Sequence, residues 1–159
     1  MRFSTASLDK KNTMKITNSI EIRSTPEKVF YWLENPNRAM EWMDSVTKTE
    51  IIKETPNMVG TTFREYIEEN GKGTEMHGKI IDFVANERLT FHLKGEFNNV
   101  KVCFILEKKG DNTKLTQHAE LRFKGVIRLM VIFLGPLFKK KIMKQSQNEF
   151  SKLKLLCEQ

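Results

Sequence analysis

The sequence is poor in cysteine and histidine, and this limits the chemistry that the chain can perform. Its two cysteines, Cys103 and Cys157, lie far apart in the chain, so no close spacing indicates a zinc site or a redox pair. Two such thiols favour a reducing compartment, and we expect a cytoplasmic protein. The three histidines are His77, His92 and His118, and they are the whole supply of imidazole for metal binding or proton transfer.

Long apolar runs are also lacking. The longest, Val126–Leu134, is interrupted by Arg128. It is about half of the roughly 20 residues that a membrane-spanning helix needs, so we expect no transmembrane segment.

The first 13 residues lack the apolar core of a secretory signal. A second methionine, Met14, opens the first regular alternation, so we expect residues 1–13 to form a disordered tail. Arg2 and the Ser/Thr content of this tail leave an organellar-targeting segment open as an alternative.

What the chain does contain indicates one folded domain over residues 14–159. Charged residues make up 30% and hydrophobic residues 39%, which is too apolar for a disordered chain. A chain of 159 residues can bury a sizeable core without the help of disulfides or bound metal ions. The net charge of +7 is concentrated toward the C-terminus, where residues 139–159 hold six lysines and two glutamates.

Alternating apolar and polar residues predict seven β-strands. In the first, Met14, Ile16, Ile20 and Ile22 share one parity, as in a half-buried strand. The others are expected at 46–53, 61–69, 73–83, 88–94, 99–108 and 113–124, separated by turn signals such as Asn70-Gly71.

Helices are expected in two places. Ser24 or Thr25 caps a first short helix that Asn35-Pro36 ends, and a second follows to Trp42 or Met43. Near the C-terminus, Gly135-Pro136 should break or kink any helix that begins near Val126. The segment after it carries one regularly spaced face, formed by Ile142, Ser146, Phe150, Leu153 and Cys157.

The chain resembles the START-like, polyketide cyclase/dehydrase and lipid-transport superfamily (SRPBCC). The resemblance is carried by ITNSIEIRSTPEKVFYWLENPNRAMEW at 16–42, GKIIDFVANERLTFHL at 78–93, KLTQHAELRF at 114–123 and the lysine-rich closing helix. It implies the α+β helix-grip fold, a curved antiparallel seven-stranded sheet wrapped around a long C-terminal helix, with two short helices after the first strand. Since its members include transporters, cyclases and hormone receptors, it implies a hydrophobic cavity rather than one activity.

Two polar residues share parity with the apolar residues of their strands. Glu65 lies between Phe63 and Ile67, and Gln117 lies near Leu115. A polar group on an inward face needs a hydrogen-bond partner, water or a ligand, so both are candidates for a cavity wall. Strand twist, a bulge or an edge position would instead leave both side chains exposed to solvent.

A register shifted by one residue would turn Arg64 and Tyr66 inward in place of Glu65. The three histidines lie on the parity opposite to the apolar residues, so we expect them to point outward. With no convergent set of ligands, no metal and no cofactor are expected.

The residues expected to line the cavity are mainly aromatic and aliphatic. They are Trp42, Phe63, Glu65, Ile67, Met76, Ile80, Phe91, Phe104, Gln117 and Phe150. Trp42 matches a tryptophan that the superfamily often has after the second short helix. Filling the core is the alternative role of the aromatic side chains.

The sequence therefore favours binding or carriage of a small hydrophobic molecule, lipid or polyketide-like, between the sheet and the last helix. The first alternative is a cyclase/dehydrase-type enzyme that uses Glu65 or Gln117 for proton transfer. The second is a protein-interaction or membrane-surface module that uses the basic helix.

The segment 126–138, followed by Lys139, Lys140 and Lys141, has three interpretations: a buried linker, a cavity lid or a weak contact with anionic lipid. Nucleic-acid binding is not expected, because the lysines have no interleaved aromatic residues. The ligand and the oligomeric state stay open.

Overall fold

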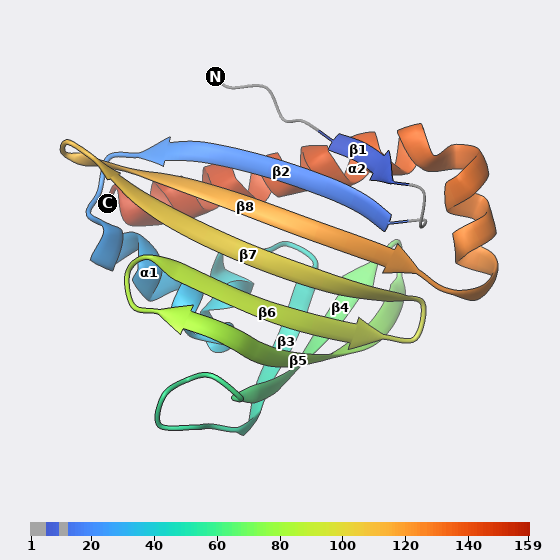
Figure 1. Ribbon diagram of the computed structural model, residues 1–159, viewed down its shortest axis with the longest axis horizontal. Coiled ribbons are helices and arrows are strands. Elements are labelled where there is room, and N and C mark those ends of the chain that lie inside the picture. Colours follow the sequence, from blue (N-terminus) through green and yellow to red (C-terminus); the bar gives the residue numbers. More distant parts are fainter. Residues whose placement is uncertain (1–5, 10–12) are drawn as a thin grey trace.

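The computed structural model describes residues 6–9 and 13–159. In this part of the chain the strands form one antiparallel sheet in the order β1-β2-β8-β7-β6-β5-β4-β3 (Figure 1). The strands are β1 (Ala6–Asp9), β2 (Thr13–Ile22), β3 (Val46–Lys53), β4 (Thr62–Glu69), β5 (Lys72–Val84), β6 (Arg88–Gly95), β7 (Asn98–Lys109) and β8 (Asn112–Phe123). The helices are α1 (Pro26–Glu34), the 3₁₀-helix η1 (Pro36–Glu41) and α2 (Gly125–Cys157).

Strands β2 to β8 are the seven that the alternation predicted, and each boundary lies within about one residue of its expected position. The expected tail over 1–13 was wrong for Ala6–Asp9, which pairs with β2 as an eighth strand, and for Thr13, which begins β2. Without β1, the outer edge of β2 would have unpaired backbone groups, which is a physical reason for the pairing. The sequence did not predict β1, because four residues are too few to show an alternation of apolar and polar side chains. Residues 1–5 and 10–12 lie outside the described part.

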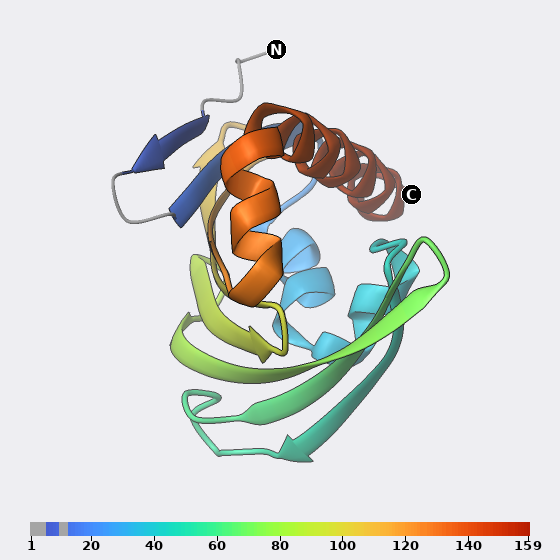
Figure 2. The same cartoon turned by 90° about the vertical axis from the view of Figure 1, so that its right-hand side faces the viewer.

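The sheet is strongly curved, and α2 lies along its concave side (Figure 2). The pairing of β3 with β4 shifts register twice, and that of β5 with β6 shifts between Ile80 and Asp82. Such irregularities bend a strand and increase its twist. The concave face and the helix cover each other, which is the helix-grip arrangement.

The two short helices form where the capping residues predicted them. The hydroxyl of Thr25 accepts a hydrogen bond from the N–H of Lys28, and Pro26 occupies the first turn of α1. The side chain of Asn35 then accepts from the N–H of Asn37 and caps η1. These helices lie at one end of the sheet, and the first part of α2 lies at the other (Figure 1).

Helix α2 is kinked where Gly135-Pro136 predicted it. Leu134 has φ −114° and ψ 15°, which are not helical values. Pro136 lacks an N–H, and its ring would clash with the carbonyl of Ile132 in a straight helix. The first part of α2 therefore takes a direction of its own.

The core has two parts. The larger lies between the sheet, α1 and the C-terminal part of α2, and it includes Phe30, Phe104 and Phe150. The smaller lies under the first part of α2, where Val131 packs with buried residues Met14, Ile16 and Leu121. Only the first of these cores surrounds the residues that the sequence marked as cavity candidates.

Candidate functional site

The interior of the grip holds a small cavity of about 70 Å³. It is bounded by side chains of α1, η1 and strands β4 to β8: Trp32, Leu33, Glu34, Asn35, Pro36, Ala39, Trp42, Met43, Phe63, Glu65, Ile80, Leu89, Phe91, Leu93, Val102, Phe104 and Gln117. Its wall is mostly apolar, with few polar groups that point inward. Such a lining is typical of ligand sites, but the free volume is well below the roughly 300–1,000 Å³ of most of them.

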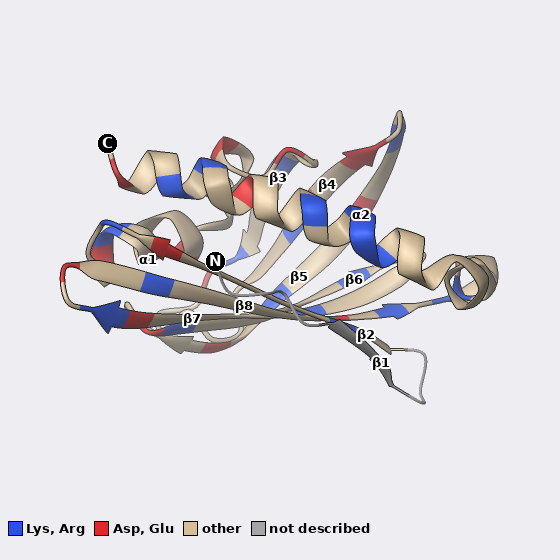
Figure 3. Ribbon diagram, turned by 90° about the horizontal axis from the view of Figure 1, so that it is seen from above, with Lys and Arg blue, Asp and Glu red and all other residues tan. Residues whose placement is uncertain are grey.

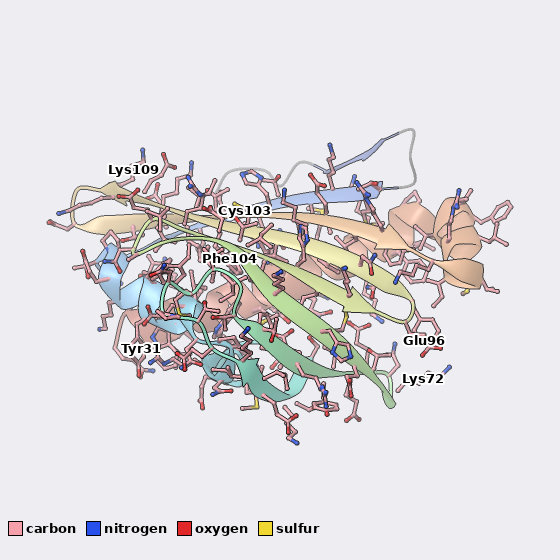
Figure 4. The ribbon with its side chains drawn as sticks, turned by 60° about the horizontal axis from the view of Figure 1, so that its bottom comes forward. Tyr31, Lys72, Glu96, Cys103, Phe104 and Lys109 are labelled. Carbon is pink, nitrogen blue, oxygen red and sulfur yellow. The ribbon has the colours of Figure 1, made fainter. Side chains whose placement is uncertain are left out.

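Aromatic rings form the centre of this wall. The ring of Phe104 on β7, labelled in Figure 4, lies 6.3 Å from that of Trp42, 6.1 Å from Phe91 and 6.5 Å from Phe150, measured between centroids. The indole N–H of Trp42 donates to the carbonyl of Trp32 at 3.3 Å, which ties η1 to α1. The cavity thus borders a packed aromatic cluster.

The ring of Phe63 is held against a strand that has no side chain at that point. A Cβ on Gly78 of β5 would lie 2.3 Å from the Cζ of Phe63, closer than any real contact. Gly78 has an ordinary φ, so its role is to make room for the ring.

The structure brings seven of the ten cavity candidates around this space: Trp42, Phe63, Glu65, Ile80, Phe91, Phe104 and Gln117. Phe150 lies behind them and packs on Phe104. Ile67 and Met76 instead border a groove at the far end of β4 and β5. The role of all ten candidates in binding a ligand stays a prediction.

Glu65 is the most unusual of these residues. Its side chain points inward, as parity predicted, and it is only 5% exposed. Among the described residues, none forms a hydrogen bond or an ion pair with it. Burial raises the pKa of Glu65 to about 7, and the nearby charge of Glu149 adds to this effect.

The alternative register for β4 was wrong. Arg64 points outward, where its Nε lies 3.3 Å from Glu75, and its guanidinium approaches the hydroxyl of Tyr66 at 3.4 Å. The pairing of Phe63 with Gly78 places Glu65 opposite Met76 on the inner face.

Glu149 on α2 does not border the cavity, but its charge acts on Glu65, and the sequence analysis missed it. It is 6% exposed, and burial raises its pKa to about 7, an effect to which the charges of Asp44 and Glu69 add. The amide of Gln145 donates to it at 3.1 Å and opposes this rise. Its position four residues before Leu153 was the available signal.

A chain of hydrogen bonds holds α2 to the sheet beside the cavity. The amide of Asn18 on β2 donates to the hydroxyl of Ser146 at 3.1 Å, and that hydroxyl donates to the Oε1 of Gln117 at 2.9 Å. Gln117 is thus partnered by protein. Asn18 was also missed, although it shares the parity of Ile16 and Ile20.

The histidines point outward, as parity predicted. His77 lies 2.9 Å from Glu75, and His118 lies 3.0 Å from the hydroxyl of Thr17. His92 borders a shallow groove on the convex face, where burial and the nearby Lys101 lower its pKa. In residues 13–159, no group of three His, Cys, Asp or Glu side chains is placed to hold a metal ion.

Both cysteines are free. Cys157 is buried in the larger core, and burial raises the pKa of its thiol to about 11. A thiol with such a pKa is a poor nucleophile at neutral pH.

A second, open groove lies at the other end of the sheet. It has a volume of about 1,180 Å³ and is formed by the β4–β5 turn, the β6–β7 turn and the start of α2. Figure 4 shows the two turns next to each other, marked by Lys72 and Glu96. Ile67, Met76, Phe97 and Ile127 are its apolar residues.

The segment 126–138 is neither a buried linker nor part of the wall around the internal cavity. None of its residues borders that cavity. Ile127 and Val131 face the smaller core, while large apolar side chains on the other face are exposed. In the described part of the chain, no helix is both long and apolar enough to cross a bilayer.

Comparisons with known proteins agree with this architecture. A family model described as "Polyketide cyclase / dehydrase and lipid transport" matches residues 13–158. No curated protein matches the chain.

Several solved structures are similar over most of the chain. A protein from Thermus thermophilus has a TM-score of 0.77 at 14% identity, covering 90% of this chain and 96% of the other. A START superfamily protein from Mycobacterium smegmatis has a TM-score of 0.77 at 15% identity, covering 91% and 97%. The Zhui aromatase/cyclase from Streptomyces sp. R1128 has a TM-score of 0.75 at 9% identity, covering 92% and 94%. At such identities the likeness concerns the fold.

Proposed function

The chain belongs to the polyketide cyclase/dehydrase and lipid transport family, and from this premise we propose that it binds a small hydrophobic molecule between the sheet and α2. The observation that carries the proposal is an internal space with a mostly apolar wall and a buried carboxyl group, that of Glu65, which has no hydrogen-bond partner among the described residues. Affinity would come mainly from the burial of apolar surface. We also propose a cytoplasmic location, which two free thiols support.

The size of the cavity limits how the ligand is held. A free volume of about 70 Å³ accommodates only a few non-hydrogen atoms, whereas a lipid or a polyketide needs several times more. Phe91 is only partly buried, and Met43 is both partly buried and flexible, so their rotation would enlarge the space. The ligand would therefore exchange places with side chains that now fill the interior.

Glu65 would define the polar end of the ligand. A protonated carboxyl group can both donate and accept a hydrogen bond, while the ionised form accepts only. With a pKa of about 7, Glu65 would suit a hydroxyl, an amide or an amine on an otherwise apolar molecule. Such a group would supply the partner that Glu65 lacks among the described residues.

Native mass spectrometry of the purified protein, with extraction of any bound material, is the test. A stoichiometric apolar compound with one polar end supports the proposal. The fluorescent apolar probe N-phenyl-1-naphthylamine should bind in competition with that compound. Failure to retain any compound, together with failure to bind the probe, would overturn the proposal.

A second candidate function is acid–base catalysis of the cyclase/dehydrase kind. It is favoured by two buried glutamates, Glu65 and Glu149, whose pKa values of about 7 suit proton transfer near neutral pH. A substrate lying between β4 and α2 would be within the influence of both.

The substitution Glu65→Gln separates the two functions. If the protein is a carrier, affinity for the extracted compound should change only a few-fold, because the amide keeps the size and hydrogen-bonding capacity of the acid. If Glu65 transfers a proton, conversion of that compound should fall far more than binding does. Glu68→Gln, an exposed change on the same strand, is the matched control.

A further inference from the structure

The first part of α2 exposes a row of large apolar side chains. Phe133 is 81% exposed, Val126 73%, Leu137 67% and Leu129 56%. Val126, Leu129 and Phe133 follow one another at spacings of three and four residues, so they lie along one side of the helix before the kink, and Leu137 follows four residues later, just beyond it. Met130, Ile132 and Leu134 widen the row.

This part of the helix is apolar on two sides. Ile127, Val131 and Phe138 pack into the smaller core over β2 and β8, which accounts for one side. A surface helix normally carries polar side chains on the other side. Here the outer side is apolar as well, and the exposed Arg128 is the charged residue among residues 126–137. An exposed apolar surface of this kind is typical of a site that binds a membrane or another molecule.

The position of the segment makes the row accessible. The kink at Leu134 turns the first part of α2 away from the rest of the helix, so that it stands at one end of the molecule (Figures 1 and 2). Next to it lies Phe97, which is 41% exposed and whose carbonyl accepts from the N–H of Lys124. The β6–β7 turn thus adds one more exposed apolar side chain near the start of the helix.

Along α2 itself, the charge that follows this row has one sign. From Gly125 to Asn148 the sequence contains no aspartate or glutamate. Lys140, Lys141 and Lys144 are exposed in the turns that follow the row. Figure 3 shows this change along α2, from an almost entirely tan first part to blue bands in its middle.

From these observations we propose that residues 126–137 of α2 insert into the interface of an anionic phospholipid membrane, with Lys140, Lys141 and Lys144 against the headgroups. Exposed phenylalanine and leucine gain free energy when they leave water for the acyl region. Lysines near an anionic surface add to the attraction. Apolar and cationic groups together match such a lipid surface better than an uncharged protein groove.

Sedimentation with lipid vesicles tests this proposal on the full chain. We expect binding to phosphatidylcholine vesicles that contain phosphatidylglycerol, weaker binding to phosphatidylcholine alone, and a loss of affinity at high salt. The double variant Leu129→Ser/Phe133→Ser should lose at least tenfold in affinity for the anionic vesicles. Circular dichroism would verify that it remains folded.

Two further variants separate the contributions. Lys140→Gln/Lys141→Gln/Lys144→Gln should remove the preference for phosphatidylglycerol and the salt dependence. Leu155→Ser changes an apolar residue, 64% exposed, in the C-terminal part of the same helix and should leave vesicle binding unchanged.

The proposal fails if the protein does not bind anionic vesicles, or if the Leu129→Ser/Phe133→Ser variant binds them as well as the parent chain does. It also fails if light scattering finds a dimer in the absence of lipid that this variant abolishes, because the row would then be an interface between two copies. None of these results depends on what the internal cavity binds.

Discussion

At the scale of single residues, Glu65 joins the site to the stability of the fold. An unfolded chain exposes this carboxyl group with a pKa near its ordinary value of 4.5, whereas burial raises the pKa to about 7 in the folded protein. Between these values the folded protein binds the proton more tightly. The contribution of Glu65 to stability is therefore greatest below the lower pKa, falls as the pH rises through about 7, and changes little once the group is ionised in both states.

Glu65→Gln should remove the part of this dependence that Glu65 contributes, while Glu149, whose pKa burial also raises to about 7, keeps its own part. At about pH 8 we expect the free energy of unfolding of the variant to exceed that of the parent by on the order of 2–3 kcal/mol, so that the variant unfolds at a higher temperature. At about pH 5 the two should differ little. Thermal unfolding across this range measures the effect. Glu68→Gln should follow the parent at every pH, and equal slopes for Glu65→Gln and the parent would contradict the expectation.

Gly78 provides a second residue-scale prediction. Gly78→Ala would force the ring of Phe63 to move, since the new Cβ would overlap its Cζ, Cε1 and Cε2 atoms. We expect a loss of about 1–3 kcal/mol from overpacking, measured by denaturant unfolding. Gly73→Ala lies on the same strand with open space around it and should have much less effect. A similar loss in both variants would mean that β5 merely tolerates no alanine.

How far the sequence predicts such residues depends on how local their signal is. The inward direction of Glu65 follows from parity along one strand, and the structure confirms it. The spacing of Glu149 from Leu153, and of Asn18 from Ile16, is an equally local sign that these side chains point inward. It was overlooked because polar side chains are expected on the surface. The approach of Glu65 to Glu149 cannot be predicted, because it depends on how α2 crosses the sheet.

At the scale of elements, α2 consists of two parts with different surroundings. The Gly135-Pro136 pair predicted the kink, and the seven strands followed from alternation, because both signals act within a few residues. The exposure of residues 126–137 did not follow from sequence. From sequence alone, an apolar run is predicted to be buried. Its exposure becomes evident only when the structure shows that the sheet does not cover it.

The C-terminal part of α2 is held by Ser146, which bonds both Asn18 and Gln117. Ser146→Ala would leave the amide of Asn18, only 7% exposed, without its partner, so we expect a loss of about 1–3 kcal/mol in the free energy of unfolding. Ser151→Ala, an exposed change that removes a bond to the carbonyl of Gln147 in the same helix, should cost no more than about 0.5 kcal/mol. Denaturant unfolding compares the two, and equal losses would show that Ser146 does not tie the helix to the sheet.

At the scale of the whole molecule, the grip encloses a core of aromatic and aliphatic side chains and a cavity of about 70 Å³ beside them. The aromatic cluster around Phe104 packs against this cavity, so its rings limit the free volume. The free volume of the interior thus depends on which side chains occupy it. Replacing a ring of the cluster by a small side chain should therefore enlarge the cavity in which a ligand can bind.

Phe104→Ala tests this view of the interior. The variant should lose about 3–5 kcal/mol in the free energy of unfolding, because three neighbouring rings lose their contact and a cavity remains. A small apolar compound such as benzene should then raise the unfolding temperature of the variant more than that of the parent, because it binds the enlarged cavity of the folded state. Phe97→Ala, in the exposed β6–β7 turn, should show neither effect. If benzene stabilised Phe104→Ala and the parent equally, the interior would have collapsed around the truncation, and the ligand would have to find its space elsewhere in the fold.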